Sequence, residues 1–451
     1  MRSINPTTGE LISETPQHDQ AAIDARINAA LTAFPDWRDR SFVERGQCFE
    51  TLAGLLNERR DDYAALMTEE MGKPIVQARS EVEKCAWVCE YFAAHAAVFL
   101  EPHSIDTDAT SSRVVYEPLG PILAIMPWNF PFWQVFRFAA PTLMAGNVAL
   151  LKHAPNVPKC SAAITALFDE AGFPVGVFND LFIDVEATGE LIGRDAIRGV
   201  SLTGSVKAGR AVAAAAGEAI KPCVLELGGS DPFVVLRDCD LDWTIQRGTY
   251  ARMMNNGQSC IAAKRFIVED ELYEEFLDRF TPSIEALTVG DPDDDDTDIG
   301  PLARADLRDN LHRQVTESID AGATCLVGGS PVEGDGFFYE PTLLSDVTPG
   351  MAAFDEETFG PVAAVIRADD VDHAIEMANR TRFGLGASIW TDAERGKELA
   401  RRFKAGSVFV NELVKSDPRL PFGGIKDSGL GRELSADGIR EFVNVKTVYV
   451  R

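Results

Sequence analysis

Cys260 is a candidate nucleophile because of the residues that precede it. It closes the segment Asn255–Cys260, which reads Asn-Asn-Gly-Gln-Ser-Cys. An unreactive cysteine packs as a small hydrophobic group and normally sits in an apolar run. Here the amides supply dipoles without a competing charge, and Gly257 lets the backbone approach closely or take a positive φ. The segment alone leaves a reactive thiol and a structural thiol both open.

Two further polar residues follow predicted buried strands. Glu226 ends an apolar run, where partial desolvation would raise its pKa and suit it to general-base catalysis near neutral pH. Asn129 stands between Trp128 and Phe130, where its amide is expected to donate a hydrogen bond to a fixed group. The alternatives are a salt-bridged glutamate and an asparagine that caps its own turn. With Cys260 they form a set of nucleophile, base and oxyanion donor.

A helix start with two glycines follows the predicted strand at residues 200–203. Gly204 and Ser205 lie in it, and N–H groups at the start of a helix favour a phosphate. The stretch lacks the dinucleotide and ATP-loop patterns, so alone it favours an ordinary capped helix start. Beside a thiol, a base and an amide, however, a nucleotide site predicts oxidation of an aldehyde through a thioester.

Composition limits the classes of function. The chain has 451 residues, so we expect two or three domains. A net charge of −27 argues against a nucleic-acid partner, because phosphate binding needs clustered Lys and Arg. No apolar run suits a membrane span or a signal peptide, and the eight cysteines lack metal-ligand spacing. We therefore expect a cytoplasmic protein without a metal. The acidity and the excess of Arg over Lys raise the hypothesis of a salt-rich environment.

The elements that must position these residues alternate between strands and helices. Long helical patterns cover residues 42–71 and 78–100, and Cys85 and Cys89 share a face of the second, which we expect in the core. Two series of apolar strands and helices follow and indicate parallel sheets, hence two α/β domains with a cleft between them. The predicted strands lie near residues 120–127, 148–152, 200–203, 223–227, 232–236, 266–268, 364–366, 387–390 and 407–410.

The chain resembles the NAD(P)-dependent aldehyde dehydrogenase superfamily over essentially its whole length. Within it, the chain is most similar to the succinate-semialdehyde dehydrogenases, notably a short bacterial branch that shares Leu151–Asn156. The matching motifs, in order, are Pro127–Pro131, Lys152, Thr203–Ser205, Glu226–Gly229, Asn256–Cys260, Glu357–Pro361, Pro421–Gly424 and Ser428–Glu433.

The resemblance implies a role for each catalytic residue. Cys260 would attack the aldehyde, and the resulting oxyanion would be held by the Asn129 amide and the Cys260 backbone N–H. Glu226 would activate the water that hydrolyses the thioester. The resemblance thus matches the set of nucleophile, base and oxyanion donor.

The resemblance also implies a cofactor site. Lys152 would hold the adenosine-side ribose and Glu357 the nicotinamide-side ribose, with the motif residues Trp128 and Phe359 nearby, and Gly204 and Ser205 would lie at the pyrophosphate. One departure bears on the cofactor: Pro155 stands where many NAD-preferring relatives have a ribose-binding glutamate. Losing that carboxylate removes repulsion against a 2′-phosphate, so we expect NADP to be tolerated or preferred over NAD.

A second departure concerns the substrate's carboxylate. Arg137 matches one arginine that grips succinate in relatives, and Ser416 matches a serine that helps. The second arginine is replaced by Met254, and the nearby Arg252 need not point the same way. Arg137 has a structural ion-pairing role as its alternative. Because one arginine replaces two as a partner for the substrate carboxylate, we expect weaker selectivity for aldehydes that carry one.

The fold implied is α/β, with two Rossmann-type parallel-sheet domains and a small β oligomerisation arm. We expect a cofactor-binding domain at 1–103 and 119–227, a catalytic domain at 228–428, and an arm at 104–118 and 429–451. The resemblance implies that the arm pairs subunits into a homodimer or homotetramer.

The predicted function is oxidation of the small molecule succinate semialdehyde to succinate with NAD(P)+. The nearest alternative is a broad-specificity aldehyde dehydrogenase for other short aliphatic or ω-carboxy aldehydes. Relatives that acylate coenzyme A do not need the base, so Glu226 favours water as the acceptor. A structural protein without cofactor binding is the alternative outside enzymes.

Overall fold

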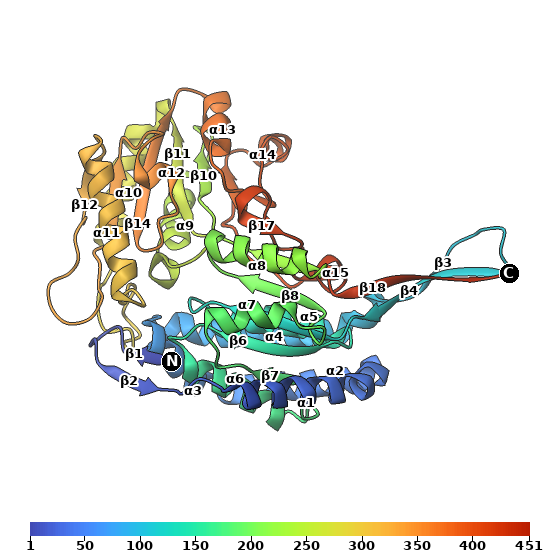
Figure 1. Cartoon of the computed structure of the whole chain (residues 1–451). Coiled ribbons are helices and arrows are strands. Elements are labelled where there is room, and N and C mark those ends of the chain that lie inside the picture. Colours follow the sequence, from blue (N-terminus) through green and yellow to red (C-terminus); the bar gives the residue numbers. More distant parts are fainter.

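Two β-sheets, each flanked by helices, occupy separate halves of the body, and a β-ribbon projects from one side (Figure 1). The computed structural model describes residues 1–451. One sheet has the order β17-β9-β8-β5-β6-β7 and the other the order β12-β13-β14-β11-β10-β15-β16. Neighbouring strands are parallel except at β17–β9 and β12–β13. The predicted α/β class with two parallel sheets is confirmed.

The six-stranded sheet contains the four strands predicted in the first series. Its helix α8 packs closely against the end of β9 because Gly209 has no side chain. A Cβ at that position would lie 2.5 Å from the Leu227 side chain. The elements are β5 (Pro121–Met126), α5 (Trp133–Met144), β6 (Val148–His153), α6 (Pro158–Glu170), β7 (Phe178–Asp180), α7 (Val185–Gly193), β8 (Gly199–Thr203), α8 (Val206–Glu218), β9 (Cys223–Glu226) and β17 (Gly429–Leu430).

The N-terminal helices pack beside this sheet. They are α1 (Gln20–Asp39), α2 (Phe42–Glu58), α3 (Arg60–Met71) and α4 (Ile75–Phe99). The single helical region predicted for 42–71 is two helices, because Arg59 leaves helical geometry with φ −109° and ψ 27°. Cys85 and Cys89 are both buried in the largest core cluster, as predicted.

The seven-stranded sheet contains the five strands predicted in the second series, flanked by helices. The elements are β10 (Asp231–Val235), α9 (Leu241–Met253), β11 (Ala263–Glu269), α10 (Asp270–Glu285), α11 (Ala305–Asp320), β12 (Thr324–Val327), β13 (Thr342–Ser345), α12 (Ala352–Asp355), β14 (Val362–Ala368), α13 (Val371–Asn379), β15 (Gly386–Trp390), α14 (Ala393–Ala400) and β16 (Ser407–Val410).

Several of these elements were not predicted from the sequence. Helix α5 is buried at every position from Trp133 to Met144, so its polar residues Gln134, Arg137 and Thr142 do not mark a solvent-exposed face. Helix α9 carries the mixed polar run that precedes the cysteine segment. An N-terminal hairpin of β1 (Arg2–Ile4) and β2 (Leu11–Glu14) was also missed.

The projecting ribbon is a three-stranded antiparallel sheet of β3 (His103–Ser104), β4 (Ser111–Pro118) and β18 (Val443–Val450). Strand β18 runs against β4 in unbroken register, from Val443 opposite Pro118 to Val450 opposite Ser111. Short elements, α15 (Ser435–Gly438) and a 3-10 turn at Lys426–Ser428, lead into it. We keep the name arm for this ribbon; its pairing between subunits stays a prediction.

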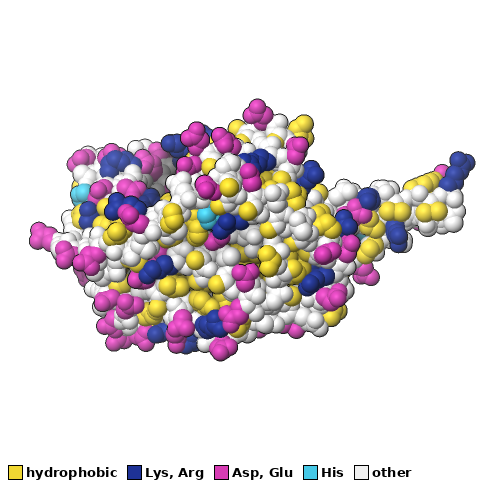
Figure 2. All heavy atoms as spheres, turned by 60° about the horizontal axis from the view of Figure 1, so that its bottom comes forward, with side chains coloured by type: hydrophobic (Ala, Val, Ile, Leu, Met, Phe, Trp, Pro, Cys, Tyr) yellow, Lys and Arg dark blue, Asp and Glu magenta, His cyan; other side chains and the backbone are white.

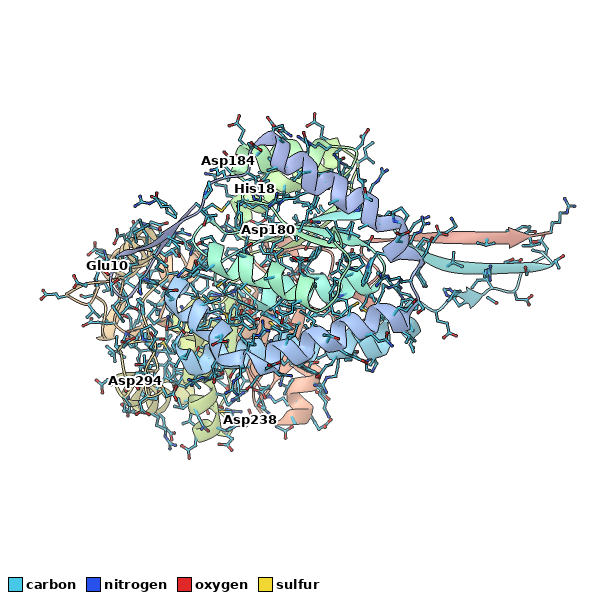
Figure 3. All side chains as sticks on the ribbon, turned by 90° about the horizontal axis from the view of Figure 1, so that it is seen from below. Glu10, His18, Asp180, Asp184, Asp238 and Asp294 are labelled. Carbon is cyan, nitrogen blue, oxygen red and sulfur yellow. The ribbon has the colours of Figure 1, made fainter.

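Acidic side chains are spread over the surface. Figure 2 shows many Asp and Glu side chains, with Lys and Arg between them, on the face that it presents. Asp293–Asp296 is an exposed loop, and Figure 3 places Asp294 at the end of the molecule away from the arm. No helix is both long and apolar enough to cross a bilayer.

Candidate active site

The segment before Cys260 adopts a backbone that few sequences tolerate. Helix α9 ends at Met253, and a short 3-10 helix, η1 (Met254–Gly257), follows. Asn255, Asn256 and Gly257 have φ values of 58°, 57° and 70°. Asparagine and glycine are the residues that enter this left-handed region most readily. A Cβ on Gly257 would lie 2.2 Å from the Gly360 carbonyl oxygen, so the predicted close backbone approach is present.

The two asparagines fasten this loop to the rest of the protein. The Asn256 amide donates to the carbonyls of Gly72 (2.8 Å) and Pro301 (2.9 Å) and accepts from the Gly300 N–H (2.8 Å). The Asn255 amide donates to the Asn129 carbonyl at 2.8 Å. The loop that carries Cys260 is therefore held from several directions before any substrate arrives.

Cys260 lies where two cavities meet. The first, of about 390 Å³, is lined by five Lys or Arg residues and a single carboxylate, Glu81; we call it the basic cavity. The second, of about 480 Å³, is lined largely by loops that follow β5, β8 and β9; we call it the strand-end cavity. Because Cys260 and Gln134 line both, a ligand in either cavity would lie beside the thiol.

Burial keeps the thiol protonated in the free protein. It raises the pKa of Cys260 to about 12, while the positive charges of Arg137 and Lys264 act in the opposite direction. The Lys264 ammonium also donates to the carbonyls of Ser259 (2.9 Å) and Cys260 (2.7 Å). Two cations thus favour the thiolate, which is the nucleophilic form.

Glu226 is in the position expected of a general base. It ends β9, is buried, and lines the strand-end cavity with Cys260. Neither of its carboxylate oxygens has a hydrogen-bond partner. Burial raises its pKa well above the usual value, and the nearby Glu433 raises it further. The salt-bridged alternative is absent, so the carboxyl group is available to exchange a proton.

The Asn129 side chain connects the loop after β5 with the cysteine loop. Its Nδ2 donates to the Gln258 carbonyl at 2.9 Å, and its Oδ1 accepts from Gln134 Nε2 at 3.1 Å. An amide nitrogen carries two hydrogens, so one remains for a ligand in the strand-end cavity. The amide spans two loops and does not cap its own turn.

Most of the predicted cofactor residues line the strand-end cavity. Ser205 caps α8 by accepting from the Ala208 N–H at 3.2 Å. Phe359 packs edge-on against Trp128, with ring centroids 5.8 Å apart. Glu357 accepts from the Gly229 N–H at 3.0 Å and lies 3.7 Å from the Lys264 ammonium. Gly204 completes this group in the cavity wall.

Lys152 and Pro155 line neither cavity. Lys152 is near the carboxyl end of β6, on the edge of the sheet from which the strand-end loops leave. Burial lowers its pKa, and the negative charge of Asp184 opposes this. Asp184 precedes α7 and lies near Asp180, the last residue of β7 (Figure 3). Pro155 is exposed.

The predicted substrate residues, Arg137 and Ser416, both line the basic cavity. Arg137 forms an ion pair with Glu433 and donates to Thr203 Oγ1 at 3.2 Å, so it has the structural partners that its alternative role predicts. Met254 lines the same cavity, whereas the Arg252 guanidinium is buried against backbone carbonyls elsewhere.

Two lysines of the candidate site, Lys264 and Lys84, were not predicted from the sequence. The Lys264 ammonium donates to the carbonyl of Cys260, and the Lys84 ammonium donates to Ser416 Oγ at 2.8 Å in the basic cavity. Lys84 lies one turn from the buried residues Glu81 and Val88 on α4. A lysine on the buried side of an otherwise apolar helical pattern is the signal that points to it.

Comparisons with known proteins cover essentially the whole chain. The profile of the aldehyde dehydrogenase family matches residues 1–448. A probable NADP(+) succinate-semialdehyde dehydrogenase of Synechocystis sp. is 52% identical over 449 residues, or 99% of each chain. The NAD(P)+ succinate semialdehyde dehydrogenase Sad of Escherichia coli is 46% identical over 99% of this chain and 97% of its own.

Solved structures extend the likeness to three dimensions. The succinic semialdehyde dehydrogenase of Streptococcus pyogenes, crystallised with NADP+ as the cofactor, is 35% identical and superposes with a TM-score of 0.97. The match covers 100% of this chain and 99% of that one. From its full-length matches in sequence and structure, the chain belongs to the aldehyde dehydrogenase family.

Proposed function

We propose that this chain oxidises succinate semialdehyde to succinate, with water as the second substrate and NADP+ or NAD+ as the oxidant. The observation that carries the proposal is the excess of positive charge at the basic cavity, where five cations are matched by only three carboxylates, Glu81, Glu412 and Glu433. An aldehyde whose far end carries a carboxylate complements that charge. The names of the two relatives above, from Synechocystis and E. coli, support the same substrate.

The residues support the following sequence of steps. The Cys260 thiol releases its proton to solvent, the thiolate forms a bond to the aldehyde carbon, and the oxyanion accepts hydrogen bonds from the Asn129 amide and the Cys260 N–H. NAD(P)+, when bound, supplies the hydride acceptor that turns this adduct into a thioester. Glu226 removes a proton from the attacking water, and the C–S bond breaks to release succinate and the thiolate.

The strand-end cavity fits a dinucleotide. It lies at the carboxyl edge of a parallel sheet, where such ligands bind, and it includes Gly204 and Ser205 at the start of α8 for a phosphate. The Glu357 carboxylate can accept from ribose hydroxyls, and Trp128 and Phe359 provide an aromatic wall. Lys152 would bind the second ribose on the same sheet edge.

NADP+ is the cofactor that we expect to be used well. Pro155 carries no charge, so it does not repel a 2′-phosphate as a glutamate would, and the Lys152 ammonium is an attractive partner for that group. Titrating both cofactors with one substrate tests this; a strong preference for NAD+ would contradict it.

The experiment that tests the function compares succinate semialdehyde with butanal, which has the same chain length and no charge. We expect kcat/KM for succinate semialdehyde to be about a hundredfold higher, because the charge of the basic cavity is then matched. Equal values would favour the broad-specificity alternative, for which Phe130, Trp133 and Tyr250 supply an aromatic surface. Formation of an acyl-CoA when coenzyme A is added would contradict water as the acceptor.

We also propose that the arm pairs this chain with a second copy into a dimer or tetramer. Val445, Tyr449 and Val450 of β18 are 61%, 51% and 48% exposed, which is unusual for a strand of a finished sheet. Light scattering coupled to gel filtration should give a mass of two or four chains, and deletion of residues 443–451 should lower it.

A further inference from the structure

The cations of the basic cavity differ in whether they are neutralised. Four of them form ion pairs with three carboxylates, so most of their charge is already balanced within the protein. These pairs are Lys73–Glu81, Arg137–Glu433, Arg247–Glu412 and Lys415–Glu412. Lys84 alone among the five has no carboxylate partner.

The Lys84 ammonium has hydrogens to spare. One donates to Ser416 Oγ, and the ammonium sits 4.1 Å from the centroid of the Trp133 ring. Trp133 Nε1 donates to the same Ser416 oxygen at 3.1 Å. Because that oxygen already accepts two hydrogen bonds, the hydroxyl hydrogen of Ser416 is left to point elsewhere. An ammonium and a hydroxyl, side by side, thus both have free donors.

An unpaired cation here is unfavourable for the folded protein. Burial, and then the charge of Arg137, lower the pKa of Lys84 to about 8. The negative charges of Glu81 and Asp417 oppose this shift, but neither carboxylate pairs with the ammonium, so a ligand is the better explanation of its position. A carboxylate would satisfy both free donors with its two oxygens.

We propose that Lys84, with the Ser416 hydroxyl, binds the carboxylate of the aldehyde substrate and is the main determinant of selectivity for ω-carboxy aldehydes. This inference rests on the proposed function and names the residue behind its substrate class. Lys84 of α4 would take over the role of the second carboxylate-binding arginine, which Met254 replaces in this chain. Arg137 then remains the partner of Glu433 and Thr203.

The test compares succinate semialdehyde with its methyl ester, which keeps the reacting aldehyde and removes the charge. Lys84→Met keeps an apolar stem over Trp133. We expect it to raise KM for succinate semialdehyde about tenfold to a hundredfold. The kcat for succinate semialdehyde, and both kcat and KM for the ester, should change less than about threefold. Lys84→Arg should recover most of the loss. Lys415→Gln is the matched control, since Lys415, unlike Lys84, lies beside a carboxylate, Glu412; its effect on KM should be much smaller.

Each result decides between the two claims. If the wild-type enzyme treats acid and ester alike, the proposed function and this inference both fail. If it prefers the acid and Lys84→Met keeps that preference, the function stands and the role of Lys84 is overturned. Equal losses for both substrates would mean a structural role and would also overturn it. If Lys84→Met does not fold, competitive inhibition by succinate in Lys84→Arg and Lys84→Gln is measured instead; unchanged inhibition overturns the inference.

Discussion

The two cavities that meet at Cys260 are built from different parts of the chain. The basic cavity takes the cations Lys84, Arg137 and Arg247 from the helices α4, α5 and α9, and loop segments such as residues 413–416 complete its wall. The strand-end cavity is lined by loops at strand ends, where backbone groups and the two carboxylates Glu226 and Glu357 prevail, with Arg304 as the one cation. A helix position can be exchanged without moving a strand, so the lining of the proposed substrate cavity can change while the proposed cofactor cavity stays constant.

Cys260 belongs to both cavities, so its removal should have the largest effect. We expect Cys260→Ala to lower kcat by about a thousandfold or more, because the covalent step disappears. Binding should persist, and tryptophan fluorescence quenching by NADPH checks this. Residual turnover near the wild-type rate would mean that another group is the nucleophile.

Glu226 lines only the strand-end cavity, and its loss should separate two steps. In Glu226→Gln, a rapid burst of about one reduced cofactor per active site should be followed by turnover slowed about a hundredfold to a thousandfold. The aldehyde still adds to the thiol, but hydrolysis of the thioester lacks its base. Rapid-mixing absorbance measures the burst. An absent burst would place Glu226 before hydride transfer.

The pH dependence of alkylation tests the protonation state of Cys260, which lines both cavities. Because burial raises the pKa of Cys260 to about 12, the thiolate fraction grows with pH throughout the neutral range. The rate of iodoacetamide labelling at residue 260 should rise about tenfold per pH unit from pH 7 to pH 9. Peptide mass spectrometry follows the site. A plateau below pH 8 would show that Arg137 and Lys264 outweigh burial.

Pro155→Glu should have the smallest effect, and it should change only the kinetic constants for the cofactor. We expect kcat/KM for NADP+ to fall about tenfold relative to NAD+, because a new carboxylate repels the 2′-phosphate. KM for the aldehyde should not change, since Pro155 lies outside the basic cavity. Pro155→Gln, of similar size and no charge, is the control. A change in aldehyde KM would break the independence of the two cavities.

The strand-end cavity could largely be predicted from the sequence. Glu226, Asn129 and Ser205 each follow an apolar run bounded by glycine or proline, and parallel strands bring their carboxyl ends together. The strained cysteine loop was predicted in part: Gly257 for a close approach, but not the left-handed asparagines before it. Their role depends on carbonyls at Gly72 and Pro301, which are far away in sequence.

The basic cavity was harder to predict, for a physical reason. Helix α5 is buried all round, so its polar residues do not mark a solvent-exposed face, and the sequence of α9 mixes charged and apolar residues without a clear apolar face. Whether a cation is free depends on carboxylates contributed by other elements, such as Glu433 for Arg137 and Glu412 for Arg247. Local patterns cannot report such pairings, and Lys84 stands out only once they are known.

The three hydrogen bonds of Asn256 also bear on how the protein ages. An asparagine followed by glycine is prone to deamidation, in which the glycine nitrogen attacks the side-chain carbonyl and closes a cyclic imide. Here Gly72, Gly300 and Pro301 fix that side chain, and Gly257 is pressed against Gly360, so the ring cannot close without opening the loop. The segment that presents the nucleophile is thereby protected from chemical decay for as long as it stays folded.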